Sequence, residues 1–483
     1  MVPPFAWRRV GGIALLVVLA LTLSANRYGY HRDELYFLVA GRHPAWGYAD
    51  QPPLVPLIAR LADTVAPGSL LALRTPATAA AVVIVVATAL LARRFGGDGT
   101  AQLLAAATVA AAAVVLGAGH LLGTTIFDLA IWTVLLLLVA RLTAGGDPIW
   151  WLAVGAVVGV CLLNKTLVAF LMAALVVGLA VVGPRQVFAS RWPYLGAVVA
   201  LAFWAPNLWW QARHGWPQLT LSRAIAAGSS GTSDTPATFV LLQFGLIGPL
   251  LVPVWVAGLW WLWRRPHWRV FPVAYALLFA AFLLTGGKAY YLAGLYPVLL
   301  AAGSIAAVGW MRRGTVVLRA TLITVAVVVS ALAASVLFLP ALPERDLAGS
   351  SVLAINYDAG ETVGWPRFAQ QVGAAAVVPD AVVLTANYGE AGAVAHYLPD
   401  GPAVYSGHNA FWWWGPPPED AEVVVAVGFE PERLDDWFAV CEIADRVDNG
   451  LGIDNDEQGA PIVVCRDRRA DWAQLWPQLQ RLG

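Results

Sequence analysis

Charged residues are scarce in this chain of 483 residues. They make up 12% of it, and hydrophobic residues make up 59%, whereas about 25% of a soluble domain is charged. Lysine is almost absent: Lys165 and Lys288 are the only two, so arginine supplies nearly every positive charge. The shortage of charge excludes an ordinary soluble protein.

Nucleotide-binding and zinc-binding motifs are also missing. The chain has no Gly-x-x-x-x-Gly-Lys-[Ser/Thr] sequence and no opening dinucleotide fingerprint, and its three cysteines and seven histidines form no zinc-like spacing. We therefore expect no nucleotide cofactor and no nucleic-acid partner. A divalent metal stays open, because Asp33, Glu34 and Asp50 could supply oxygen ligands.

Long apolar runs are the main feature of the sequence. A run of about 17–25 residues crosses a bilayer core, and about eleven such runs are centred near residues 18, 81, 108, 133, 156, 174, 201, 250, 278, 300 and 327. The first is too long, and too well followed by others, for a cleaved signal peptide. The sequence predicts a polytopic helical membrane protein.

The balanced net charge hides an asymmetry between two parts. Residues 1–340 hold 22 basic and 8 acidic side chains, and residues 341–483 hold 8 basic and 22 acidic ones. This switch predicts a transmembrane domain over 1–340 and a separate domain over 341–483. Arginines fall in alternate loops, so the positive-inside rule predicts a cytoplasmic N-terminus and an extracytoplasmic C-terminal domain in the plasma membrane.

The loop after the first apolar run gathers rare acids. It contains Asp33, Glu34 and Asp50, three of the eight acids in the first 340 residues. Ionisable groups at membrane level are costly and are usually retained for a function. The two lysines are expected on the same outer side, where they either bind an anion or extend to the membrane interface.

Three motifs together resemble the family 39 glycosyltransferases. These are Asp33-Glu34 after the first span, Gln51-Pro52-Pro53-Leu54 closing the loop, and Lys288-Ala289-Tyr290-Tyr291-Leu292 before a late span. The family includes protein O-mannosyltransferases and the lipid A aminoarabinose transferase. The resemblance covers roughly residues 10–310 and implies the GT-C membrane fold. Two positions depart from the aminoarabinose-type pattern: Gln51 replaces a lysine, and Tyr36-Phe37 stand where an arginine is usual.

The resemblance also implies an activity and a set of site residues. Such enzymes transfer a sugar from a polyprenyl-phosphate carrier to an acceptor hydroxyl of a protein, glycan or lipid on the outer side of the membrane. Asp33 matches the catalytic acid and would be the general base, while Glu34 would assist it, orient a partner or hold an arginine. The residues expected to bind the donor phosphate are Arg32, Arg42, Lys165, Lys288 and Arg223. Those expected to contact the substrate are Asp50, Gln51, His214, Tyr290 and Tyr291.

For several of these residues, a purely structural role is the alternative to a functional one. Asp33 could cap a helix over 34–41, and Asp50 could cap a helix that starts near Pro53. His120 and Asp128 are expected to make polar contacts between helices. The tryptophans beside His214 suit either an aromatic belt or a sugar-binding face. Residues 228–233 are rich in glycine and serine and could form a lid over the acceptor.

The C-terminal part is predicted to be α/β. Buried strands are expected over 381–385, 422–427 and 461–465, with helices near 388–398 and 430–445. Cys441 and Cys465 are expected to form a disulfide across a helix and a strand, or else to be two separate thiols, and Cys161 is expected to be a buried free thiol. At least one of three consecutive tryptophans, Trp412 to Trp414, is expected to rest on the membrane, on the transmembrane part or on carbohydrate.

A transporter or lipid flippase is the rival class, with the acidic loop as its substrate or coupling site. Transporters tend to place charges near the bilayer midplane in repeated halves. Here the charged residues gather on one side and no internal repeat is visible, which favours the transferase.

Overall fold

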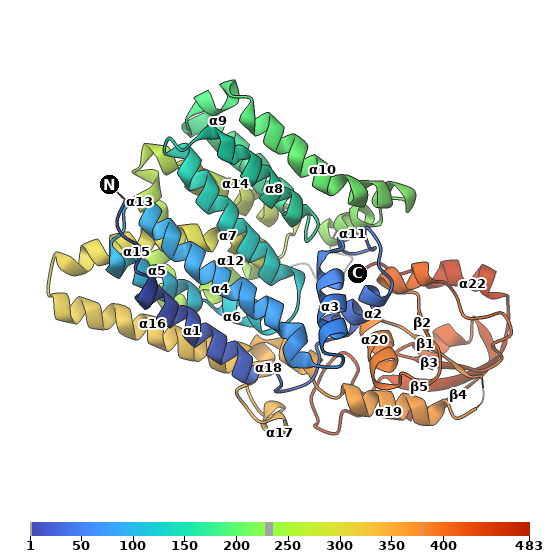
Figure 1. Ribbon diagram of the computed structural model, residues 1–483. Helices are drawn as coiled ribbons and strands as arrows, with labels where there is room; N and C mark the ends of the chain where they lie inside the picture. Colours follow the sequence, from blue (N-terminus) through green and yellow to red (C-terminus); the bar gives the residue numbers. More distant parts are fainter. Residues whose placement is uncertain (1, 228–234, 379) are drawn as a thin grey trace.

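The computed structural model describes residues 2–227, 235–378 and 380–483. A bundle of apolar helices occupies one side of the molecule and a small α/β domain the other, with α2 and α3 between them (Figure 1). The bundle helices are α1 (Trp7–Ser24), α4 (Leu70–Arg94), α5 (Gly99–Ala110), α6 (Ala113–His120), α7 (Thr124–Thr143), α8 (Trp151–Leu162), α9 (Val168–Val182), α10 (Trp192–Arg213), α12 (Pro236–Ile247), α13 (Val252–Trp263), α14 (Val270–Thr285), α15 (Tyr296–Arg312) and α16 (Val316–Phe338).

The bundle is that of a multi-pass membrane protein. Within the described residues, six helices are long and apolar enough to cross a membrane, and up to eight spans result if each of two bent helix pairs counts as one. The pairs are α5 with α6, bent by 58°, and α12 with the segment 249–263, bent by 81°. Ten of the eleven predicted centres fall on these helices, and the centre near residue 250 falls in the short turn between α12 and α13. Helices α8 and α9 are apolar but shorter than the six long ones.

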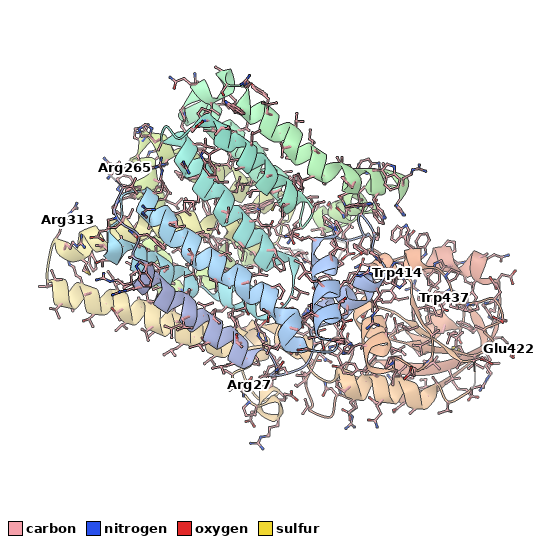
Figure 2. All side chains as sticks on the ribbon, viewed as in Figure 1. Arg27, Arg265, Arg313, Trp414, Glu422 and Trp437 are labelled. Atoms are coloured by element: carbon pink, nitrogen blue, oxygen red, sulfur yellow. A yellow bond between two sulfur atoms is a disulfide. The ribbon has the colours of Figure 1, made fainter. Side chains whose placement is uncertain are left out.

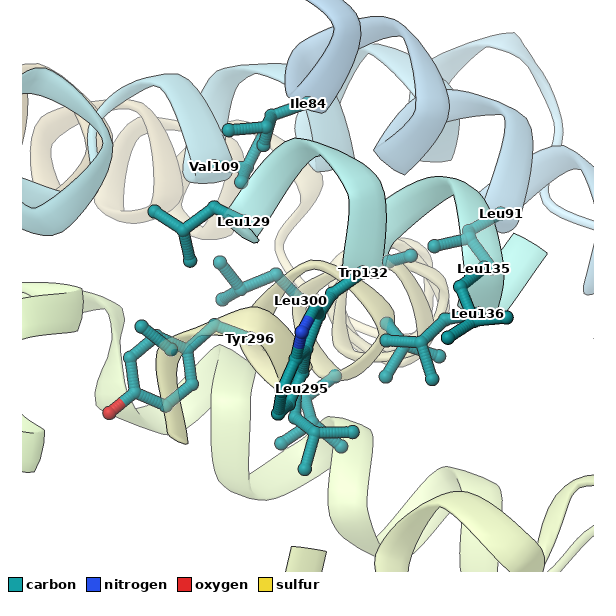
Figure 3. Packing of buried hydrophobic residues seen from close by; sticks show 14 of the residues in the cluster. Ile84, Leu91, Val109, Leu129, Trp132, Leu135, Leu136, Leu295, Tyr296 and Leu300 are labelled. Atoms are coloured by element: carbon teal, nitrogen blue, oxygen red, sulfur yellow. The ribbon is translucent and has the colours of Figure 1, made fainter. Parts of the chain in front are cut away.

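The bundle core is closely packed around Trp132 of α7, which is fully buried. Its ring lies beside Leu295 and Tyr296 at the start of α15 (Figure 3). Gly294 makes this possible, because a Cβ there would overlap the indole. Glycines also face backbone where α8 meets α10 and where α13 meets α15, as is usual for helices that pack without a hydrophobic driving force.

The C-terminal domain is built on a mixed five-stranded sheet of order β2-β1-β3-β5-β4. Strands β2, β1 and β3 are parallel, and β5 runs antiparallel to both β3 and β4. The strands are β1 (Val382–Thr385), β2 (Val404–Ser406), β3 (Val424–Val427), β4 (Phe438–Arg446) and β5 (Pro461–Arg468). The helices of this part are α17 (Glu344–Leu347), α18 (Val352–Ile355), α19 (Trp365–Ala375), α20 (Tyr388–Tyr397), α21 (Pro431–Leu434) and α22 (Trp472–Leu479).

The predicted helix over 430–445 is wrong. Only α21 forms, and the chain then enters β4, where Phe438 is buried and most of the other side chains are exposed. Strand β4 lies at the edge of the sheet and pairs with β5. The pairing places Cys441 opposite Cys465, with a Cα separation of 4.2 Å, and confirms the predicted disulfide, although it joins two strands. Cys161 is a buried free thiol, as predicted.

The loop after α1 forms part of the same core as the C-terminal domain. Its helices are α2 (Arg32–Arg42) and α3 (Leu54–Val65), and a third short helix, α11 (Pro217–Ala226), lies nearby. Leu35 and Tyr36 of α2 share a buried cluster with Val383 of β1 and Val394 of α20. Gly392 of α20 faces the backbone of Leu35, so the two helices cross at close range. The loop therefore joins the sheet domain to the bundle.

Candidate active site

A cavity of about 1270 Å³ lies between the bundle, the loop that contains α2 and the C-terminal domain. Apolar side chains from the bundle line one part, among them Val114, Leu121, Ile126, Leu246 and Phe338. Polar groups of the loop and of the C-terminal domain line the rest. A cavity with an apolar and a charged part suits an amphipathic ligand.

Asp33 faces this cavity from the first turn of α2. The helix begins at Arg32 and is capped by His31, whose ring accepts a hydrogen bond from the Asp33 amide at 3.2 Å. The alternative in which Asp33 caps the helix is therefore wrong, and its carboxylate is left for the cavity. The Tyr388 hydroxyl, from the first turn of α20, donates to that carboxylate at 2.8 Å.

The charge state of Asp33 follows from its surroundings. Burial favours the neutral acid, but electrostatic interactions with His31 and Arg32, the Tyr388 hydrogen bond and the charge of Lys288 outweigh it and lower the pKa of Asp33 below its usual value. The start of a helix also favours negative charge. Asp33 is thus a carboxylate that can accept a proton.

Glu34 is turned away from the cavity, although it is the next residue. It is fully buried, and Arg74 of α4 binds it through two hydrogen bonds at 2.9 and 2.8 Å. It also accepts the backbone N–H groups of His31 and Leu122, both at 2.9 Å. The expectation that Glu34 holds an arginine is confirmed, and its contacts join the loop to the bundle.

Asp50 also lines the cavity. Its carboxylate accepts a hydrogen bond from Tyr36 at 2.6 Å, and the Tyr36 ring lies 5.0 Å from that of Tyr388. The helix that follows begins at Leu54 without a side-chain cap, so the capping alternative for Asp50 is wrong. Burial raises the pKa of Asp50 to about 6, which separates it from Asp33.

The cations expected at the site are distributed unevenly. Arg32 and Lys288 line the cavity, and Arg32 is paired with Glu361 at 3.5 Å and Asp456 at 2.5 Å. Lys165 lies 4.9 and 5.0 Å from the centres of the Tyr290 and Tyr291 rings, and Tyr290 itself lines the cavity.

Other expected residues lie elsewhere. Arg42 is exposed, 3.9 Å from Asp63, and Arg223 is exposed on α11. Gln51 is buried beside the cavity lining. His214 stacks on Trp210 at 4.0 Å in a second, smaller pocket with Arg42 and Trp414.

The structure also bears on the predictions for His120, Asp128 and the consecutive tryptophans. His120 lies 3.4 Å from Arg74 and 3.5 Å from Ser24, and Asp128 lies 3.5 Å from Cys161, so both make polar contacts between helices as predicted. Trp414 stacks on His43 of the loop, at 4.4 Å. The predicted lid over 228–233 lies outside the described residues.

The described part of the chain contains no group of three or more His, Cys, Asp or Glu side chains suited to hold a metal ion. Asp33 and Glu34 point to different partners, Tyr388 and Arg74. Sequence reasoning missed Tyr388, His31 and Arg74. The capping pattern His31-x-x-Glu34 was a signal for the second of these, because a Glu at the third helical position is typical of a capping box.

Comparisons with known proteins agree with this architecture. Residues 50–210 match the family model of the dolichyl-phosphate-mannose-protein mannosyltransferases. Two crystal structures of ArnT from Cupriavidus metallidurans, one in the apo state and one bound to undecaprenyl phosphate, align with a TM-score of 0.62. They are 15% and 16% identical to this chain, and each alignment covers 94% of it and 97% of ArnT. No curated protein matches the chain. The family match supports the resemblance to the family 39 glycosyltransferases over residues 50–210, and the structural alignment shows that the chain has the GT-C fold.

Proposed function

We propose that the protein is a membrane glycosyltransferase that moves a sugar from a polyprenyl-phosphate donor to an acceptor hydroxyl, with Asp33 as the general base. The observation that carries the proposal is the position of Asp33. Its carboxylate lies in a cavity whose other wall is apolar and comes from the bundle. A lipid-linked sugar has the same two parts, an apolar chain and a polar head.

Asp33 supplies the base. The acceptor hydroxyl attacks the anomeric carbon of the sugar, the bond from that carbon to the phosphate oxygen breaks, and the phosphate leaves with the electron pair. The hydroxyl proton passes to the Asp33 carboxylate. Tyr388 supports this step, because its hydrogen bond fixes the orientation of the carboxylate. A base of this kind must lie within hydrogen-bond reach of the proton it accepts.

Lys288 is the cation best placed for the departing phosphate. It lines the cavity, and its charge lowers the pKa of Asp33. Fixed positive charge beside a leaving phosphate stabilises the transition state. Lys165, behind the Tyr290 ring, adds charge at longer range. Arg42 and Arg223 lie outside the proposed donor site.

The apolar wall suits the polyprenyl chain. Residues of α6, α7 and α12 line it, with Phe338 at the end of α16. The similar ArnT fold has been solved with undecaprenyl phosphate bound, which supports a polyprenyl phosphate as the donor carrier here.

The proposed reaction takes place on the outer side of the plasma membrane. Arg265 and Arg313 lie at the end of the bundle opposite the C-terminal domain (Figure 2). Arginine-rich loops favour the cytoplasmic side, so the cavity and the C-terminal domain would face outward and the N-terminus inward. A site at one end of the bundle also differs from the midplane sites of transporters.

The test is transfer by Asp33→Asn. The amide keeps the shape of the carboxylate but accepts no proton, so we expect transfer from a polyprenyl-phosphate sugar to fall by about 10²–10⁴-fold. Asp63→Asn is the matched control, since Asp63 lies in the same loop and does not line the cavity. Near-normal transfer by a folded Asp33→Asn protein would refute the assignment.

A further inference from the structure

The parallel part of the C-terminal sheet ends at the cavity. Asn387 and Tyr388 follow β1, His408 follows β2 and Gly428 follows β3, and all four residues line the cavity. In open α/β sheets, ligands bind outside the carboxyl ends of parallel strands, where consecutive connections run in opposite directions. Here α20 leads from β1 to β2 on one side, while β3 lies on the other side of β1. Asn387 and Tyr388 stand at this point.

The two ring nitrogens of His408 can form hydrogen bonds that no described residue of the protein makes with them. The His408 side chain is only 4% exposed, and neither ring nitrogen has a hydrogen-bond partner among the described residues. Leaving a buried polar group unpaired is costly, and such groups call for an explanation. The ring lies 4.9 Å from that of Tyr388, whose hydroxyl binds Asp33. A ligand that reaches Asp33 along this wall can therefore satisfy His408.

Two titratable groups on this wall, His408 and Glu390, are neutral. Burial lowers the pKa of His408 to about 3, so the ring is neutral and can both donate and accept. Burial also raises the pKa of Glu390 to about 8, so this acid is mostly protonated at neutral pH. Arg446 and Arg481 also line the cavity, and so do the acids Asp33, Asp358 and Asp456. Because these charges of opposite sign offset one another, they do not favour a second anion beside the proposed phosphate.

We propose that Tyr388 and His408, at the carboxyl edge of the C-terminal sheet, form a subsite for a neutral, hydroxyl-rich group, a carbohydrate ring, next to Asp33. The proposal rests on the proposed function and gives the C-terminal domain a direct part in it. The ring belongs either to the acceptor or to the donor sugar. Both have the same chemistry, because each presents hydroxyls that donate and accept.

The test is the binding of neutral methyl glycosides to the full-length protein loaded with undecaprenyl phosphate, followed by saturation-transfer NMR. The probes are methyl α-D-mannopyranoside, methyl β-D-glucopyranoside and methyl β-L-arabinopyranoside. We expect at least one to bind, and His408→Phe to weaken it by about tenfold, as the loss of one or two hydrogen bonds implies. His408→Gln, which keeps a donor and an acceptor, should restore much of the affinity.

The controls separate this subsite from the catalytic assignment. His214→Phe, in the other pocket, should bind as the unchanged protein does, and Asp33→Asn should keep glycoside binding while losing transfer. Replacing undecaprenyl phosphate by undecaprenyl phosphate mannose identifies the source: the glycoside is displaced if the subsite holds the donor sugar, and stays if it holds the acceptor. The proposal is overturned if no glycoside binds, or if a folded His408→Phe protein binds it with unchanged affinity.

Discussion

Helices α2 and α20 begin at the same cavity and have the same N-terminal device, but they treat their buried glutamates differently. Each has a capping box, formed by His31 with Glu34 in α2 and by Asn387 with Glu390 in α20. Glu34 is bound by Arg74. No salt bridge involves Glu390 in the described part of the chain, and burial raises the pKa of Glu390 to about 8.

The difference shows two structural roles that a buried glutamate can have at the start of a helix. The arginine partner of Glu34 ties the loop to α4, so that α2 is held in place. Without such a partner, Glu390 caps its helix mostly as a neutral acid and adds little charge to the cavity. Asp33 directly precedes Glu34, and Tyr388 lies two residues before Glu390. The Tyr388 hydroxyl and the Asp33 carboxylate meet in the cavity through one hydrogen bond. In the first turn of each helix, one residue thus has a structural role and another faces the cavity.

The largest effect should come from removing Glu34. Glu34→Ala leaves Arg74 as an uncompensated buried charge, which typically costs about 3–5 kcal/mol. We expect the free energy of unfolding, measured in detergent by denaturant titration, to fall by that amount, whereas Asp33→Asn should change it little. The double variant Glu34→Gln with Arg74→Met should recover part of the loss. A loss below about 1 kcal/mol, within the range of exposed ion pairs, would contradict the structural role.

Removing a cavity cation should have the next largest effect. Hydrogen bonds to charged groups are worth about 1.5–3 kcal/mol, so Lys288→Ala should weaken the binding of undecaprenyl phosphate by about ten- to a hundredfold. Arg42→Ala is the control, because Arg42 is exposed and does not line the cavity. Equal losses in the two variants, measured by lipid titration, would count against Lys288 as the phosphate ligand.

The most gradual effect is a pH dependence set by Glu390. The pKa of Glu390 is raised from 4.5 to about 8 in the folded protein, so between these values the folded state holds a proton that the unfolded state has lost. This contribution to stability is complete below pH 4.5 and is lost as the pH rises through 8, at up to about 1.4 kcal/mol per pH unit. Glu390→Gln cannot titrate and should flatten that slope. Parallel unfolding curves for the two proteins from pH 5 to pH 8 would contradict it.

Local patterns in the sequence were enough to predict the bundle helices, α20 and three strands. Apolar runs place the bundle helices, and short β-branched runs place β1, β3 and β5. The helix predicted over 430–445 failed because β4 is stabilised by its pairing with β5 and by the disulfide, and neither can be read from the residues of that segment. Tertiary contacts override such local preferences.

The candidate site was predictable only in part. Asp33, Asp50, Lys288 and Tyr290 came from motifs, and all four line the cavity. Tyr388 could not be predicted, because it lies 355 residues from Asp33 and reaches it only when α20 packs on α2. Arg74 lies inside an apolar helix and gave no signal of its partner. The exposed positions of Arg42 and Arg223 depend on how the loops fold, which spacing does not determine.

The most direct test of the central claim, that the Asp33 cavity holds the lipid-linked donor, is an experimental structure of the protein with undecaprenyl phosphate bound. The account predicts that the phosphate contacts Lys288 beside the Asp33 carboxylate and that the first isoprene units follow the apolar wall past Ile126 and Phe338. A phosphate bound instead near Arg42 or Arg223, outside the cavity, would contradict it.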